Sequence, residues 1–113
     1  MIISWNHAAE RMFGYPKNEI IGRHISTLVP HQKRGELDDI LRKIAQGTGI
    51  SSLETQRVRK DGKIIEVELT ISPIVDGEGQ TIGASTISRD ITFKKAEERL
   101  RTVRKNTALL LIT

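Results

Sequence analysis

The chain has 113 residues, 37% of them hydrophobic and 28% charged, so it is long enough for one hydrophobic core and too short for two domains. It has no cysteine, which excludes disulfides, thiolate metal sites and cysteine nucleophiles. The net charge is +4, but residues 1–92 carry 12 basic and 12 acidic side chains, so the whole excess follows Thr92. With only 4% aromatic residues, this neutral part lacks the basic stacking surface of nucleic-acid-binding proteins. We expect one soluble, cytoplasmic domain.

The beginning of the chain predicts a strand followed by short helices. Met1–Trp5 reads as a short strand, and Asn6 is a good N-cap for a helix over His7–Phe13. Gly14 is expected to end this helix, and a second short helical segment should end at Gly22, since glycine is the usual residue just after a helix C-terminus.

One long amphipathic helix is predicted over Gln32–Gln46, before glycines break the pattern. Its apolar residues recur three and four positions apart, as they do on the buried face of a helix. The residues on this predicted core face are Leu37, Ile40, Leu41, Ile44 and Ala45.

The middle of the chain predicts three consecutive antiparallel strands. Apolar and polar residues alternate over Ile65–Ser72, which is typical of a half-buried strand. Leu53–Lys60 precedes it across a tight turn, in which Asp61–Gly62 should occupy two positive-φ positions. A looser turn at Asp76–Gly79 leads to the third strand, Thr81–Ile91. The single apolar face of such a meander needs a helical cover, so the predicted fold class is α+β.

After Thr92 the apolar residues change to heptad spacing, which predicts a helix over residues 93–106. The predicted stripe consists of Phe93, Ala96, Leu100 and Val103. Helices of about 12–15 residues are marginal in water, so we expect this stripe to contact a second chain in a homodimer. Residues 107–113 either begin another module or act as an exchanged strand. Their apolar run is far below the roughly 20 residues that span a bilayer, so no membrane insertion is expected.

Short motifs occur along the chain in a characteristic order. They are Trp5-Asn6, Ala9-Glu10, Phe13-Gly14-Tyr15, Glu19, Ile21-Gly22, Leu28-Val29-Pro30, Lys60-Asp61-Gly62 and Arg89-Asp90-Ile91-Thr92. Together they resemble a PAS domain with its C-terminal PAC segment, with the domain core at residues 1–92. The resemblance implies a five-stranded antiparallel sheet of order 2-1-5-4-3 with helices on one face and a C-terminal signalling helix. The family's central first strand is expected to be missing, because Met1–Trp5 corresponds to the second.

The resemblance implies a non-enzymatic sensory and dimerisation module of a signal-transduction protein. Its usual companion is the effector domain of a sensor histidine kinase, as in two-component systems, with cyclic-dinucleotide enzymes and transcription regulators as alternatives. A different hypothesis is a small-molecule sensor whose apolar pocket is occupied by a metabolite or a non-covalent flavin.

The candidate pocket lies between the long helix and the second strand. Its predicted residues are Leu37, Ile40, Leu41, Ile44, Val67, Leu69 and Ile71, which alternatively just fill the core. Family members that hold haem use a histidine in or just after the long helix, and Gln32–Ser52 contains none. The family's photoreceptors that form a cysteinyl-flavin adduct need a cysteine, which is absent. Both observations argue against those cofactors.

The junction Asp90-Ile91-Thr92 is the candidate signal relay, because the resemblance implies that it couples the sheet to the output helix. Asp90 lies where a carboxylate caps a helix N-terminus, and a pairing with a nearby arginine is also possible. The candidate arginines are Arg57, Arg59 and Arg89. No catalytic motif is found, and His7, His24 and His31 lack metal-ligand spacing, so neither a catalytic nor a metal site is expected.

Overall fold

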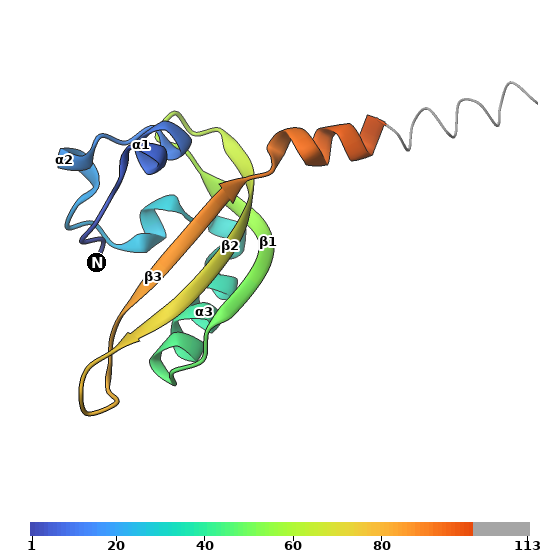
Figure 1. Cartoon of the computed structure of the whole chain (residues 1–113). Coiled ribbons are helices and arrows are strands. Elements are labelled where there is room, and N and C mark those ends of the chain that lie inside the picture. Colours follow the sequence, from blue (N-terminus) through green and yellow to red (C-terminus); the bar gives the residue numbers. More distant parts are fainter. Residues whose placement is uncertain (101–113) are drawn as a thin grey trace, which may run out of the picture.

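A computed structural model of the chain describes residues 1–100. The helical elements are α1 (His7–Phe13), α2 (Lys17–Ile20), the 3-10 helices η1 (Ile25–Leu28) and η2 (His31–Lys33), and α3 (Arg34–Ala45). The strands are β1 (Ile50–Val58), β2 (Ile64–Val75) and β3 (Thr81–Asp90), and residues 92–100 are again helical. The predicted α+β class is confirmed, as is the succession of helices, three strands and a C-terminal helix after residue 6 (Figure 1).

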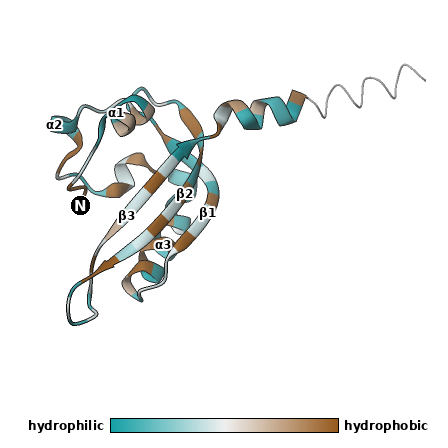
Figure 2. Ribbon diagram, viewed as in Figure 1, coloured by the Kyte–Doolittle hydropathy of each residue, from teal (hydrophilic) through white to brown (hydrophobic). Residues whose placement is uncertain are grey.

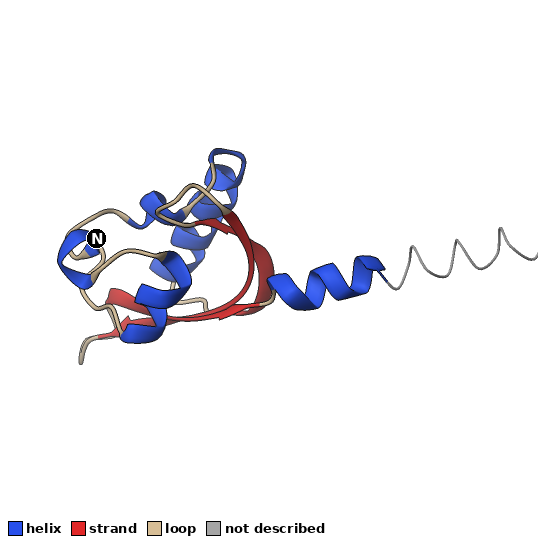
Figure 3. Ribbon diagram, turned by 90° about the horizontal axis from the view of Figure 1, so that it is seen from above, coloured by secondary structure: helices blue, strands red, loops and turns tan. Residues whose placement is uncertain are grey.

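The three strands form one antiparallel sheet in the order β1-β2-β3. This is the meander expected for the last three strands of the implied sheet. In register, Thr55 of β1 lies opposite Val67 of β2, and Val67 lies opposite Asp90 of β3. Figure 3 shows that the sheet is curved, that the helices before it lie on its concave side, and that the helix over 92–100 projects from the other side.

The core fills the space between the concave face of the sheet and the helices. Apolar and polar residues alternate along β2, so every second side chain points into this space (Figure 2). Val67 and Ile20 have no exposed surface. The buried cluster consists of Ile2, Phe13, Ile20, Leu28, Ile40, Ile44, Ile65, Val67, Leu69 and Ile71. Each such side chain contributes about 1.5–3 kcal/mol by leaving water.

The turn between β1 and β2 differs from the prediction of two positive-φ residues. Gly62 has a φ of 85°, whereas Asp61 has an ordinary negative φ. The backbone N–H of Gly62 donates to Arg59 O at 3.0 Å, and the N–H of Arg59 donates to Lys63 O at 2.9 Å. The loop is therefore one residue longer than a two-residue hairpin turn, so only its last residue needs the left-handed conformation.

The prediction of a strand at Met1–Trp5 is wrong. The segment makes one pair of backbone bonds with a loop, because the Ile2 N–H donates to Arg23 O and the Gly22 N–H donates to Ile2 O, both at 2.8 Å. A strand needs a neighbouring strand for its ladder, and β3 is an edge strand in the described part of the chain. Met1–Trp5 is consequently held outside the sheet by the burial of Ile2, by this pair of bonds and by the hydrogen bond that Trp5 Nε1 donates to Tyr15 O at 3.0 Å.

Helix α1 is held at both ends. The Asn6 side chain accepts a backbone N–H of the first turn at 2.9 Å, as predicted, and Gly14 follows the last turn with a φ of 81°. The Arg59 guanidinium donates to two backbone carbonyls of the last turn, at 3.2 and 2.8 Å. The N–H of Lys60 donates to a third at 2.9 Å. The β1–β2 turn therefore supplies partners for carbonyls that a helix C-terminus leaves unpaired.

Candidate functional site

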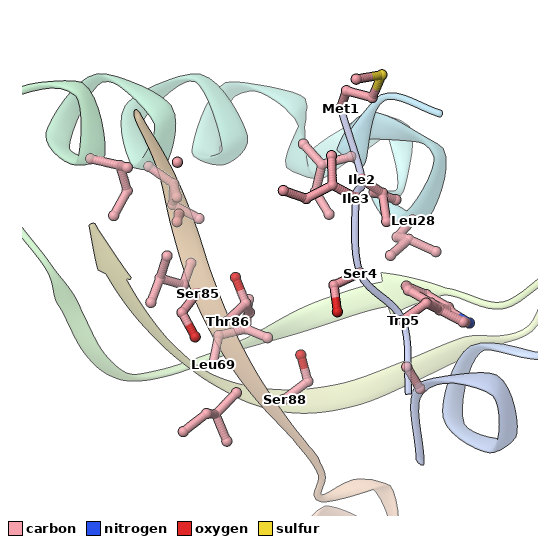
Figure 4. Close-up of a pocket in the computed structure, with 18 of the residues that line it drawn as sticks. Met1, Ile2, Ile3, Ser4, Trp5, Leu28, Leu69, Ser85, Thr86 and Ser88 are labelled. Carbon is pink, nitrogen blue, oxygen red and sulfur yellow. The ribbon is translucent and has the colours of Figure 1, made fainter. Parts of the chain in front are cut away.

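A cavity of about 1300 Å³ lies between the concave face of the sheet, α3 and the N-terminal segment. Figure 4 shows the N-terminal segment along one side, with Ser4 and Trp5, and the strand β3 along another, with Thr86 and Ser88. Leu69 of β2 also lines the cavity and lies beside β3 in this view. The lining is mostly apolar, with hydroxyl groups at its β3 side.

Most of the predicted pocket residues meet at this cavity. The ones that line it are Leu37, Ile40, Leu41, Ile44, Leu69 and Ile71. Val67 does not line it, because this side chain is enclosed completely by the core. The prediction that Leu41 belongs to the buried face of the helix is wrong, since 41% of Leu41 is exposed. The apolar stripe of α3 is wider than the surface that a three-stranded sheet covers, so Leu41 lies in the open part of the cavity.

A buried polar cluster was missed by the sequence analysis. Thr55 and Arg57 of β1 are 4% and 5% exposed, and both contact the carboxylate of Glu36 at the start of α3. The Thr55 hydroxyl donates to its two oxygens at 2.7 and 3.0 Å, and Arg57 Nη1 donates to Oε1 at 3.3 Å. Burial lowers the pKa of Arg57, and the charge of Glu36 opposes that shift. The detectable signal was a Thr and an Arg two positions apart on one strand, on the face that also holds core residues.

The junction after β3 is bonded directly to the central strand. The N–H of Ile91 donates to Glu66 O at 2.9 Å, and the N–H of Glu66 donates to Thr92 Oγ1 at 3.0 Å. The Asp90 carboxylate accepts the N–H of Thr92 at 2.9 Å, and Ile91 is buried. Residues 90–92 thus attach the start of the helix over 92–100, which follows β3, to the central strand β2.

The suggested ion pair between Asp90 and an arginine is not found among the described residues. Each candidate arginine bonds another carboxylate: Arg57 with Glu36 at 3.3 Å, Arg59 with Asp61 at 3.5 Å and Arg89 with Glu68 at 3.1 Å. Adjacent residues of a strand point to opposite faces, so Arg89 cannot turn toward Asp90. Asp90 instead caps the helix with its own side chain, the other role that the sequence suggested.

The helix over 92–100 is docked on the convex side of the sheet by two ion pairs. Lys95 Nζ lies 2.9 Å from the Glu54 carboxylate of β1, and Arg99 Nη2 lies 3.4 Å from that of Glu66 on β2. The hydrogen bond and charge of Lys95 lower the pKa of Glu54, and the hydrogen bond from Glu54 raises the pKa of Lys95. The first turns of this helix are therefore connected to two strands.

The predicted heptad stripe is described only in part. Phe93 is 81% exposed, Leu100 is 55% exposed, and Ala96 is half-buried. Val103 and the segment 107–113 lie outside the described residues. Two large apolar side chains of the stripe are thus exposed on the single chain.

The histidines and acidic side chains give no sign of a metal or membrane site in the described part of the chain. Nδ1 of His24 accepts the backbone N–H of Ser26 at 3.1 Å and caps η1. Among residues 1–100, no group of three or more histidine, aspartate or glutamate side chains is placed to hold a metal ion. Within the same range, no helix has the length and apolar character needed to cross a membrane.

Comparison with known proteins identifies the family. A sequence profile of the PAS fold matches residues 1–91. This chain belongs to the PAS family. A crystal structure of the PAS domain of a protein from Colwellia psychrerythraea is 33% identical, with a TM-score of 0.72 over 80% of this chain and 77% of that one. The resemblance seen in the sequence motifs is confirmed, and the chain is a PAS sensory domain.

Two relatives of this PAS domain are signalling proteins. Two-component system protein A of Emericella nidulans is 34% identical over 103 residues, which are 86% of this chain and 14% of the relative. Signal transduction histidine-protein kinase AtoS of Escherichia coli is 31% identical over 98 residues, 87% of this chain and 16% of the relative. The chain therefore spans about one-seventh of the length of these relatives.

Proposed function

We propose that this PAS domain passes a conformational signal from its sheet through Asp90, Ile91 and Thr92 to the following helix, and from there to an effector such as a histidine kinase. The observation that carries the proposal is the pair of bonds between Glu66 of β2 and the junction, at 2.9 and 3.0 Å. A shift or twist of β2 at Glu66 has to move the start of the helix, because both backbone groups of Glu66 are engaged there. The kinase among the relatives supports this type of effector.

The side chain of Glu66 adds a second connection further along the same helix. Its carboxylate lies 3.4 Å from Arg99 and also accepts a hydrogen bond from Gln56 of β1 at 3.1 Å. Lys95 joins the helix to β1 through Glu54. The direction of the helix is thus tied to two strands, whereas its far end projects away from the domain (Figure 1). Small changes in the sheet would be amplified along a helix anchored at one end.

The proposed signal path is tested in a chimaeric kinase. This chain replaces the matching segment of AtoS, and autophosphorylation of the chimaera is measured. Asp90→Ala removes a helix cap, so it should lower the free energy of unfolding by about 0.5–2 kcal/mol and leave the domain folded while it changes kinase output. The matched control is Asp76→Ala, because Asp76 accepts two backbone N–H groups, at 2.9 and 3.0 Å, in the turn far from the junction. If kinase output changes in both variants in proportion to their loss of folding free energy, Asp90 has only a structural role.

We also propose that the stripe of Phe93, Ala96, Leu100 and Val103 forms a homodimer contact. The exposure of Phe93 and Leu100 supports it, since large apolar side chains on a short helix favour a partner surface. Leu100→Glu should shift the protein from dimer to monomer in analytical ultracentrifugation, whereas Lys94→Glu, an exposed position off the stripe, should not. A wild type that is already monomeric would contradict the dimer.

A second function is favoured by the cavity: a small-molecule sensor whose occupancy sets the output. A volume of about 1300 Å³ is large enough for a small molecule, and the lining combines apolar walls with a few hydroxyl groups. Native mass spectrometry of the purified protein should show a bound small molecule. Absorbance above 300 nm would reveal a flavin or a haem, and a protein mass equal to that of the bare chain would contradict a tightly bound ligand.

A further inference from the structure

We propose that the cavity takes a small molecule with an apolar body and one carboxylate group, and that Arg57 binds the carboxylate. The inference rests on the second proposed function, the small-molecule sensor, and names its ligand class. Among the described residues that line the cavity, Arg57 is the only one with an ionisable side chain. A single buried cationic side chain among uncharged side chains defines where a charged group of the ligand can be placed.

The guanidinium of Arg57 has donors to spare. Its described hydrogen bonds both use Nη1, which donates to Glu36 Oε1 at 3.3 Å and to the backbone oxygen of Gln56 at 2.6 Å. Within residues 1–100, every side-chain nitrogen or oxygen that is fully buried has a hydrogen-bond partner. Nε and Nη2 of Arg57 have no such partner, so these two atoms are not fully buried. These two nitrogens form the edge of the guanidinium that binds a carboxylate through two parallel hydrogen bonds.

Among the anions that Arg57 could bind, the charge of the cluster favours a monoanion over a dianion. Glu36 compensates Arg57 incompletely, because it makes one long hydrogen bond to it, is shared with the Thr55 hydroxyl, and has a side chain that is one-quarter exposed. A ligand carboxylate would place Arg57 between two carboxylates, and the three groups together would carry a net charge of −1. A phosphate dianion would add a second negative charge beside Glu36, which the surroundings do not compensate.

The rest of the cavity fits an apolar body. Phe13, Leu28, Leu37 and Ile40 line it together with Arg57, so a hydrocarbon or aromatic chain attached to the carboxylate would be removed from water. Trp5 also lines the cavity and is the only tryptophan of the chain. Its fluorescence therefore reports specifically on this site.

The experiment titrates the full chain with octanoate and with octanamide, below their aggregation concentrations, and follows the fluorescence of Trp5. The two probes share the apolar body and differ in charge. Octanoate should bind at least about tenfold more tightly, the scale of a charge-assisted bidentate contact. Arg57→Gln should remove this preference and leave octanamide binding unchanged. The control is Arg89→Gln, an arginine that pairs with Glu68 on the other face of the sheet and should keep the preference.

Glu36→Gln gives a prediction of opposite sign, which does not depend on whether Arg57→Gln folds. Removal of the competing carboxylate should tighten octanoate binding and leave octanamide unchanged. Equal binding of the two probes to the wild type, or no gain with Glu36→Gln, would overturn the carboxylate assignment and leave the sensor proposal standing. If neither probe binds, the assignment is also overturned, and native mass spectrometry of the purified protein decides separately whether the cavity holds any ligand.

Discussion

The neighbouring residues Ile40 and Leu41 of α3 should respond differently to truncation. Each change to alanine removes three carbon atoms, but Ile40 is 6% exposed and Leu41 is 41% exposed. At about 0.8 kcal/mol for each buried carbon, Ile40→Ala costs about 2.4 kcal/mol before the cavity it leaves is counted, and a total of about 2–5 kcal/mol is expected. Leu41→Ala, scaled by its buried fraction, costs about 1.4 kcal/mol and leaves no closed cavity.

Urea denaturation followed by circular dichroism and Trp5 fluorescence measures both losses. Domains of this size have a free energy of unfolding of about 5–15 kcal/mol, so both variants should remain folded in water. The slope of the free energy with urea should stay the same, which keeps the two midpoints comparable. A loss for Leu41→Ala as large as that for Ile40→Ala would show that α3 presents a different face to the sheet.

Three further predictions concern the helix over 92–100 and two glycines. The pKa of Glu54 lies below its ordinary 4.5 and that of Lys95 above its ordinary 10.5, so the docking they provide is at full strength between these values. It should weaken as pH falls through the folded pKa of Glu54 or rises through that of Lys95, which is measured as the protection of the helix amides from exchange relative to the unfolded chain at the same pH; protection that stays constant across both limits would contradict it. Gly14→Ala should destabilise by about 1–2 kcal/mol, because Gly14 has a φ of 81°. Gly35→Ala in α3, with no atom within 4 Å of the added carbon, should stabilise the fold by about 0.4–1 kcal/mol. Thermal unfolding measures both glycine variants, and unfolding temperatures that shift in the same direction would contradict these two predictions.

Elements whose signals are local could be predicted from the sequence. The N-cap Asn6, the left-handed Gly14 and the alternation along β2 all depend on neighbours within a few positions, and the structure has each of them as expected. The prediction for the turn at Asp61 was wrong in the length of the loop. Two-residue and three-residue hairpin loops share the Asp-Gly signal and differ only in which strand residues pair.

The features that sequence reasoning missed depend on contacts between distant segments. Met1–Trp5 has the composition of a strand, but its state depends on whether another strand lies beside it. Leu41 follows the periodicity of a core residue, yet its exposure depends on how wide the sheet is. The cluster around Arg57 joins residues 21 positions apart. The alternation along β1 places Thr55 and Arg57 on the face that holds core residues, but nothing near them in the sequence identifies Glu36 as their partner.

The bonds that the β1–β2 turn makes to α1 have a consequence for the order in which the chain folds. Helix α1 has 7 residues, about half the length at which isolated helices are marginally stable in water. The Arg59 side chain that bonds its last turn lies 47 and 48 positions later in the sequence. At a synthesis rate of about 5–20 residues per second, the ribosome takes about 2–10 s to add those residues. During that interval the first helix lacks its C-terminal partners, so the nascent chain exposes Phe13 and its apolar neighbours until the hairpin has closed.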